Sequence, residues 1–135
     1  WYPMECLTDS IHAARLIDLS EAEGVPIDMM IGLKFPAYLA YHPNPVFWLL
    51  HQHRQAYDMW DAGTSDLLDM PDGMMARNMI QAEDRAAFAR SHRPIYANSE
   101  NVAGRLKKYL DLDATSLYHP PPLANQLRQG DYGDY

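Results

Sequence analysis

Short apolar runs alternate with segments of helical periodicity along most of this chain, and that alternation constrains its fold more than any other feature. A short apolar run bounded by turn residues is typical of a buried strand, whereas apolar spacings of three and four predict an amphipathic helix. Strands that alternate with helices form a parallel sheet. The predicted strands are residues 27–33, 46–50, 93–99 and 114–118. We therefore predict an α/β fold, a Rossmann-like, doubly wound parallel sheet of three to four strands flanked by helices.

Two of the predicted helices lie near the ends of this pattern. The first covers about residues 5–20 and is closed by Gly24 and Pro26, with its apolar side formed by Leu7, Ile11, Ala14 and Ile17. The other follows Ser99, a good N-cap residue, and runs over 100–110 with Val102, Leu106, Tyr109 and Leu110 on its apolar side. Both patterns predict helices that cover the sheet.

A third helix is predicted in the middle of the chain, over about residues 74–91. Asp72 precedes it in a position to cap its first turn. Its apolar side is assigned to Met75, Met79, Ala82, Ala86 and Ala89. We expect this methionine-rich side to face the core.

The connecting segments are rich in turn residues. Residues 34–45 contain three prolines and predict a loop with one helical turn, and residues 54–60 predict two helical turns. Residues 61–73 form an acidic loop that contains Asp61, Asp66, Asp69 and Asp72. After the last strand, "HPPP" at 119–122 predicts a stiff, extended exit.

Composition narrows the class of protein. A chain of 135 residues with 47% apolar residues has the size and content of one globular domain. It contains no apolar run long enough to cross a bilayer and no start that resembles a signal peptide. Cys6 is the only cysteine, which fits a reducing compartment, and the net charge of −7 argues against a general nucleic-acid binder.

Three polar residues are predicted to converge at one edge of the sheet. Lys34, His51 and Ser99 each lie at or just past the end of a predicted strand, and open parallel sheets bind their ligands along the edge where strands end. No glycine-rich phosphate loop accompanies them. Ser99 is also explained as a simple helix cap, although a capped helix start leaves free N–H groups at the same edge.

The "HQHR" segment leaves several interpretations open. His51 and His53 have the spacing of a metal-binding pair, but a metal needs further ligands, and the nearest are His42 and the acidic loop. Either ring is equally well explained as a structural histidine. Arg54 could be a solvated cation, although a positive charge at a helix start opposes the helix dipole and favours a ligand role. The basic run at 105–108 is interpreted as a solvated face.

Two stretches resemble a known family. "KFPAYLAYHPNPVFWLLHQHRQAYDMWD" and "RPIYANSENVAGRLKKYLDLDATSLYHPPPLANQLRQGDYGDY" are similar to the later part of the N-terminal, acceptor-side domain of glycosyltransferase family 4, which are nucleotide-sugar-dependent enzymes of the GT-B fold. The most telling pieces are "HQHRQAYD", "ANSENVAGRL" and "YHPPP". The resemblance covers most of the chain.

The resemblance implies a function and a set of site residues. It implies transfer of a sugar from a nucleotide-sugar donor to an acceptor hydroxyl, with retention, and without a cofactor or catalytic cation. His51 matches the histidine that faces the transfer site, with His53 as an alternative register. Lys34, His53, Arg54 and Ser99 are then expected to contact a sugar or lipid-linked acceptor. The parent enzyme would act in the cytoplasm, at the inner membrane face if the acceptor is a lipid, and would not bind nucleic acid.

The resemblance also implies a division of the chain and an exposed edge. Residues 1–118 would form part of the acceptor-side domain, and 119–135 would lead toward a donor-binding domain that does not match here. The start at Trp1 and the end on "GDYGDY" are interpreted as those of a fragment, inactive alone. The strand at 27–33 would then pair on one side only, and we expect it to allow self-association.

Two other classes of function remain as alternatives. The chain could be a non-catalytic Rossmann-like domain that binds a ligand or a partner through the same edge of the sheet. It could also be a regulatory or metal-binding α/β domain built on His51 and His53.

Overall fold

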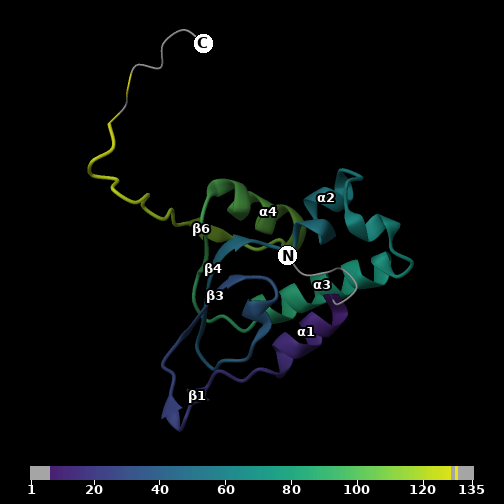
Figure 1. Cartoon of the computed structure of the whole chain (residues 1–135), viewed down its shortest axis with the longest axis horizontal. Helices are drawn as coiled ribbons and strands as arrows, with labels where there is room; N and C mark the ends of the chain where they lie inside the picture. The colour runs from purple at the N-terminus through teal and green to yellow at the C-terminus, as the bar shows by residue number, and fades with distance from the viewer. Residues whose placement is uncertain (1–6, 129, 131–135) are drawn as a thin grey trace.

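The computed structural model describes residues 7–128 and residue 130. Four strands form one parallel sheet in the spatial order β3-β4-β5-β6 (Figure 1). They are β3 (Met30–Lys34), β4 (Pro45–His51), β5 (Ile95–Ala97) and β6 (Ala114–Ser116). The predicted α/β fold with a parallel, Rossmann-like sheet is confirmed. Strand β5 is shorter than the predicted run at 93–99, whereas β4 is longer than the predicted run at 46–50.

Three helices of ten residues or more cover the sheet, and shorter turns connect them. The helices are α1 (Leu7–Leu16), α3 (Gly73–Phe88) and α4 (Glu100–Leu110). The single turn α2 (Asp58–Asp61) and the 3-10 turns η2 (Ala37–Leu39), η3 (Arg54–Ala56) and η4 (Asp66–Asp69) lie in the predicted loops. The helical turn expected within 34–45 and the two expected within 54–60 are therefore present.

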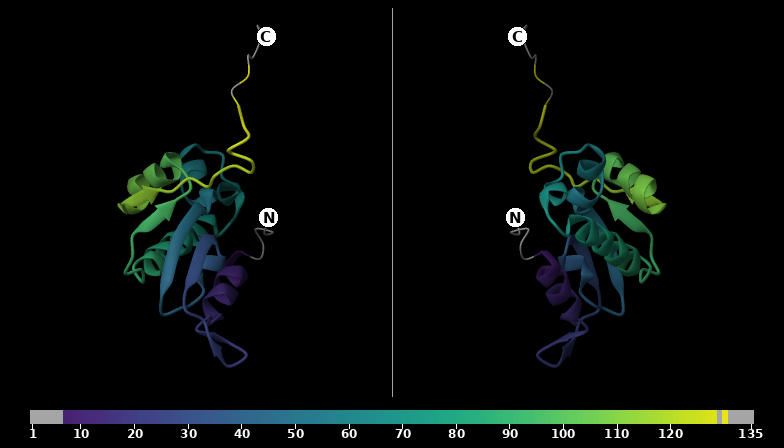
Figure 2. Two further views of the ribbon diagram at one scale, coloured as in Figure 1. Left: turned by 90° about the vertical axis from the view of Figure 1, so that its left-hand side faces the viewer. Right: turned by 90° about the vertical axis from the view of Figure 1, so that its right-hand side faces the viewer.

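All three helices lie on the same face of the sheet, which corrects the doubly wound arrangement. The strand order increases steadily from β3 to β6, and right-handed crossovers then put every connection on one side. The core consequently forms between that face and the helices, around Phe47, Leu49 and Ile80. Figure 2 shows the sheet from its two sides, with α3 in front of the strands in the right-hand view. No helix of the described residues covers the other face, where Ile31 is 51% exposed.

The first helix is shorter than predicted. Residues 5 and 6 lie outside the described residues, and α1 ends at Leu16 instead of about 20. The chain then pairs with Tyr41, whose N–H donates to the carbonyl of Ile17 at 2.8 Å and whose carbonyl accepts from Leu19 N–H at 2.9 Å. Ile17 is therefore half-exposed, while Leu7, Ile11 and Ala14 are buried as predicted.

A small hairpin that the sequence did not predict follows α1. Strands β1 (Glu21–Ala22) and β2 (Val25–Pro26) pair antiparallel. Glu23 and Gly24 join them with positive φ angles of 52° and 78°, as the tightest hairpin turns require. The glycine that was expected only to close a helix therefore builds this turn, and the expected proline, Pro26, ends β2.

The buried side of α3 differs from the predicted one. Met75 is 57% exposed, and the predicted alanines face solvent. The buried residues are Gly73, Ala76, Ile80, Asp84, Ala87 and Phe88. The pattern misled because a carboxylate, Asp84, lies in the middle of the buried side. Asp72 occupies the N-cap position, but its side chain makes no capping hydrogen bond.

The first residues of α4 and α3 are each determined by one local residue, Ser99 and Gly73. Ser99 Oγ accepts a hydrogen bond from Val102 N–H at 3.3 Å, so the predicted cap and the helix over 100–110 are confirmed. At the start of α3, a Cβ on Gly73 would lie 1.6 Å from the carbonyl oxygen of Leu67. Only glycine allows α3 to begin this close to η4.

Strand β3 is the end strand of the sheet in the described part of the chain. It pairs with β4 and with no other described strand. The prediction that this strand pairs on one side only is therefore confirmed.

Candidate functional site

The carboxyl ends of the strands bring the predicted residues to one edge, which we call the rim. Lys34 ends β3 and His51 ends β4, and the two are directly paired in the register of these strands. Asn98 N–H donates to Leu49 O at 3.0 Å, which places Ser99 beside the end of β4 at the same edge. The predicted convergence of Lys34, His51 and Ser99 at the rim is therefore present in the fold.

The His51 ring has one nitrogen fixed and one available. Its Nδ1 lies 2.7 Å from the carbonyl oxygen of Gln52. A carbonyl only accepts, so Nδ1 carries the proton and Nε2 of the neutral ring is an acceptor. Nε2 makes no hydrogen bond within the described residues, and it is not among their enclosed polar atoms. The ring can thus accept a hydrogen bond from a hydroxyl group at the rim.

The His53 ring has a different environment from that of His51. It packs edge-on against the Phe35 ring, with 5.0 Å between ring centroids. Burial lowers the pKa of His53 to about 4, with a smaller contribution in the same direction from His51, so the ring is neutral near pH 7. Its Nδ1 is enclosed and has no partner among the described residues. The His53 ring therefore lies beneath the surface of the rim, packed against Phe35.

His42, the nearest candidate for a third metal ligand beside His51 and His53, is already engaged within the fold. His42 is 2% exposed and uses both ring nitrogens within the fold: Nε2 donates to Ile27 O at 2.9 Å, and Nδ1 accepts from Asn44 N–H at 2.9 Å. Among residues 7–128 and 130, no three His, Cys, Asp or Glu side chains gather closely enough to hold a metal ion.

Arg54 is engaged in an ion pair. Its Nε and Nη2 donate to Oδ2 of Asp58 at 2.8 and 2.6 Å, and Arg105 Nη1 lies 3.5 Å from the same oxygen. Burial would raise the pKa of Asp58, but the hydrogen bond and charge of Arg54, together with Arg105, lower it overall. The carboxylate is therefore ionised and joins the segment after β4 to α4.

The basic run on α4 only partly matches the predicted solvated face. Lys107 pairs with Asp111 and Asp113, and Lys108 pairs with Asp61, all as exposed side chains. Arg105 is the exception, because its side chain is only 15% exposed. Its position one turn and a half into α4 turns it toward Asp58.

Enclosed polar atoms without a partner occur in the segment that follows His51 and on α4. Within the described part of the chain they are Gln52 Nε2 and Oε1, His53 Nδ1, Asp58 Oδ1 and Arg105 Nε. Gln52 is only 1% exposed. Native proteins leave few such atoms, and each one needs an explanation such as an ordered water or a functional role. The sequence did not predict the burial of Gln52, Asp58 and Arg105, because nothing in their residue types indicates it.

A buried carboxylate in α3 forms a second polar cluster, which the sequence did not predict either. Asp84 is fully buried, and its two oxygens accept hydrogen bonds of 2.7 Å from the hydroxyls of Tyr38 and Tyr57. Burial raises the pKa of Asp84 to about 7, although the two tyrosine hydroxyls act in the opposite direction. The sequence could have indicated this burial, because Asp84 lies at helical spacing from Ala76, Ile80 and Ala87.

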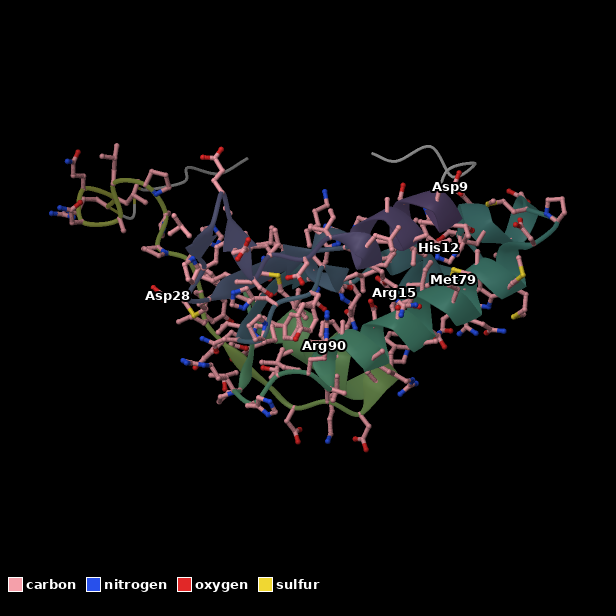
Figure 3. All side chains as sticks on the ribbon, turned by 90° about the horizontal axis from the view of Figure 1, so that it is seen from below. Asp9, His12, Arg15, Asp28, Met79 and Arg90 are labelled. Carbon is pink, nitrogen blue, oxygen red and sulfur yellow. The ribbon has the colours of Figure 1, made fainter. Side chains whose placement is uncertain are left out.

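A shallow hollow lies between α1 and α3, away from the rim. Figure 3 shows Arg15 of α1 facing α3, and its Nη1 lies 2.8 Å from Oε1 of Glu83. The Arg90 guanidinium donates to the carbonyls of Tyr38 and Leu39 at 3.3 and 3.2 Å. The hollow is lined by Arg15, Leu39, Glu83, Ala86, Ala87 and Arg90. Arg15 and Arg90 are already engaged with other groups of the fold, so we do not assign a ligand to this hollow.

No family model matches this chain, and neither a curated protein nor a solved structure is significantly similar to it. None of the helices in the described residues is both long enough and apolar enough to cross a membrane.

Proposed function

We propose that this chain is the acceptor-side part of a nucleotide-sugar-dependent glycosyltransferase. The support is the resemblance of "HQHRQAYD", "ANSENVAGRL" and "YHPPP" to glycosyltransferase family 4, together with a parallel sheet whose carboxyl edge carries the resembling residues. Open sheets of this kind bind their ligands at that edge. The fold alone serves many functions, so the proposal depends on the rim residues.

The observation that carries the proposal is a set of enclosed polar atoms without partners, in the segment that follows His51 and on α4. Gln52, His53, Asp58 and Arg105 are enclosed but incompletely hydrogen-bonded, while the His51 Nε2 lone pair is available at the edge. Such a cluster is costly for folding and is typical of a place that recognises polar groups. A hydroxyl-rich ligand supplies both donors and acceptors to these side chains.

His51 would act on the sugar at the reacting carbon. In the transfer, the bond from the anomeric carbon to the donor phosphate breaks, the acceptor oxygen bonds to that carbon, and the hydroxyl proton passes to the departing diphosphate. Configuration is retained, and the transition state resembles an oxocarbenium ion. A neutral His51 ring that accepts a hydroxyl hydrogen bond through Nε2 stabilises this positive charge better than an imidazolium would.

The other rim residues would orient the acceptor. Lys34, next to His51 in the register, supplies a cation for an anionic or hydroxyl-rich group. Ser99 holds the start of α4, where free N–H groups face the same edge. His53 would support the ring of His51 from inside. Arg54 would contribute only through the donors that its pair with Asp58 leaves free.

The domain division and the location complete the proposal. Residues 1–118 would form the acceptor-side domain, and 119–135 would lead to a donor-binding domain that supplies the nucleotide site. A single cysteine fits a cytoplasmic enzyme. A lipid-linked acceptor would bring it to the inner face of the membrane.

The test is donor turnover by the complete gene product that contains this chain. We expect release of nucleoside diphosphate from one of UDP-glucose, UDP-N-acetylglucosamine or GDP-mannose, with the sugar recovered on an acceptor hydroxyl in the α configuration of the donor. Binding of saccharides without any release from a wide set of donors would instead support the non-catalytic alternative and would contradict the proposal.

A further inference from the structure

The buried carboxylate of Asp84 connects three separate segments of the fold. Its Oδ1 accepts from Tyr38 OH and its Oδ2 accepts from Tyr57 OH, both at 2.7 Å. Tyr38 lies in η2, on the connection that leaves the rim after β3. Tyr57 follows η3, on the segment that leaves the rim after β4. A single side chain of α3 therefore holds the segments that follow β3 and β4.

The two held segments are those that carry the candidate site. Tyr38 is four residues after Lys34, and Tyr57 is four residues after His53. Arg77 Nε and Gln81 Nε2 of α3 also donate to the carbonyl of Ala56, both at 3.1 Å, so the same helix fixes the backbone next to Tyr57. Movement of either tyrosine would therefore be transmitted to a rim residue four positions earlier in the chain.

A purely structural role would be better served by an apolar residue. Asp84 is fully buried and makes no ion pair within the described residues. Burying a carboxylate without a cation costs several kcal/mol, and well-packed apolar replacements of buried polar groups are often equally stable or more so. An apolar residue cannot fix the directions of the two tyrosine hydroxyls, whereas a carboxylate accepts a hydrogen bond from each of them.

We propose that Asp84 is a positioning residue of the rim, which sets the relative placement of the Lys34 and His51 segments through Tyr38 and Tyr57. This inference rests on the proposed function only in taking the rim as the site. The carboxylate is held by donors from two loops, and neither loop can shift without lengthening one of the two hydrogen bonds.

The hydrogen-bond pattern of this cluster changes with protonation. The ionised carboxylate accepts from both tyrosines, whereas the neutral acid accepts from one and donates to the other. The groups that face it are Tyr38 from η2, Tyr57 from the segment after η3, and Glu83 of α3, whose charge raises the pKa of Asp84 further. The charges of Arg77 and Arg85 act to lower the pKa of the Tyr57 hydroxyl, against the larger raising effects of burial and of Asp84. Placement of the rim segments therefore depends on pH near neutrality.

The test follows the backbone amides of Lys34 and Gln52 by NMR in the labelled chain, without any sugar present. Asp84→Asn keeps the shape of the side chain but cannot ionise. We expect it to shift both amides and to abolish an inflection in their pH titration near the pKa of about 7. Leu110→Ala, at the buried far end of α4, is the control for lost stability and should shift neither amide.

Two milder variants keep the proposal testable if Asp84→Asn does not fold. Tyr38→Phe should shift the Lys34 amide, and Tyr57→Phe should shift the Gln52 amide, since each removes one hydroxyl and keeps the ring. Rim amides that remain unmoved in the variants that fold, or an inflection that persists in Asp84→Asn, would overturn the positioning role. Because no substrate is involved, this result is independent of whether the protein transfers a sugar.

Discussion

The buried polar groups of the core and those of the rim differ in how completely they are hydrogen-bonded. In the core, both oxygens of Asp84 and both ring nitrogens of His42 have partners, and Ser65 Oγ donates to Gln55 O and accepts from Leu67 N–H. At the rim, Gln52 is equally buried and its amide has no partner among the described residues.

The difference separates two uses of buried polarity. A satisfied group specifies how segments pack, so its removal should cost stability. An unsatisfied group lowers stability where it lies, so its presence is better explained by recognition than by folding. On this basis the satisfied cluster around Asp84 sets how its segments are placed, and the residues after His51 are the ones we propose as the site.

The largest expected effect is on the core. Asp84→Leu removes the acceptor of two buried hydroxyls, and each unsatisfied group costs 1–3 kcal/mol, so we expect a loss of roughly 4 kcal/mol in the free energy of unfolding by urea. Adding Tyr38→Phe and Tyr57→Phe to the same chain should restore most of it. A single Asp84→Leu variant as stable as the wild type would remove the distinction between core and rim.

The free energy of unfolding should also depend on pH, in opposite directions for His53 at the rim and Asp84 in the core. The pKa of His53 is lowered from 6.5 in the unfolded chain to about 4 in the folded chain. Between these two pH values the unfolded chain binds one more proton than the folded chain. The free energy of unfolding therefore rises with pH across this range, by on the order of 3 kcal/mol. The pKa of Asp84 is raised from 3.8 to about 7, so the folded chain binds the proton and stability falls as pH rises through that range.

Two variants separate these contributions in urea titrations at a series of pH values. His53→Gln should remove the rising contribution between pH 4 and 6.5, and Asp84→Asn should remove the falling one up to about pH 7. Profiles that keep the wild-type slope in either variant would show that the corresponding group does not titrate as its environment implies.

A smaller effect is expected for the unsatisfied amide of the rim. Gln52→Leu replaces enclosed atoms that lack partners by an apolar side chain of similar size, so stability should change by less than about 1 kcal/mol and could increase. The matched comparison is Asp84→Leu, measured in the same urea experiment. A loss for Gln52→Leu as large as that for Asp84→Leu would show that Gln52 is part of the packing.

The smallest effect is expected at the exposed end of the rim. Arg54 is paired with Asp58, but its side chain is 51% exposed, and such pairs contribute about 0–1 kcal/mol. Arg54→Ala should therefore lower the midpoint of urea unfolding only slightly. A large loss would mean that the Arg54–Asp58–Arg105 group supports the fold as a unit.

Periodicity predicted the elements of the sheet, and strand ends predicted the rim, because both depend on patterns along the chain. The helix over 100–110 was located to the residue, since Ser99 and its apolar spacing agree. The buried side of α3 was wrong, because Asp84 is buried only through contacts with residues 46 and 27 positions away. Burial of Gln52 and Arg105 likewise depends on tertiary contacts, and no property of a single residue indicates it.

We propose above all that this protein acts on a ligand at the rim, with His51 in contact with it. The most direct measurement is nucleotide-sugar turnover by the complete gene product with His51→Ala, next to His12→Ala, which removes an exposed histidine of α1. We predict that His51→Ala lowers turnover at least about 100-fold with unchanged circular dichroism, and that His12→Ala leaves it unchanged. Turnover near the wild-type level in His51→Ala would contradict the claim.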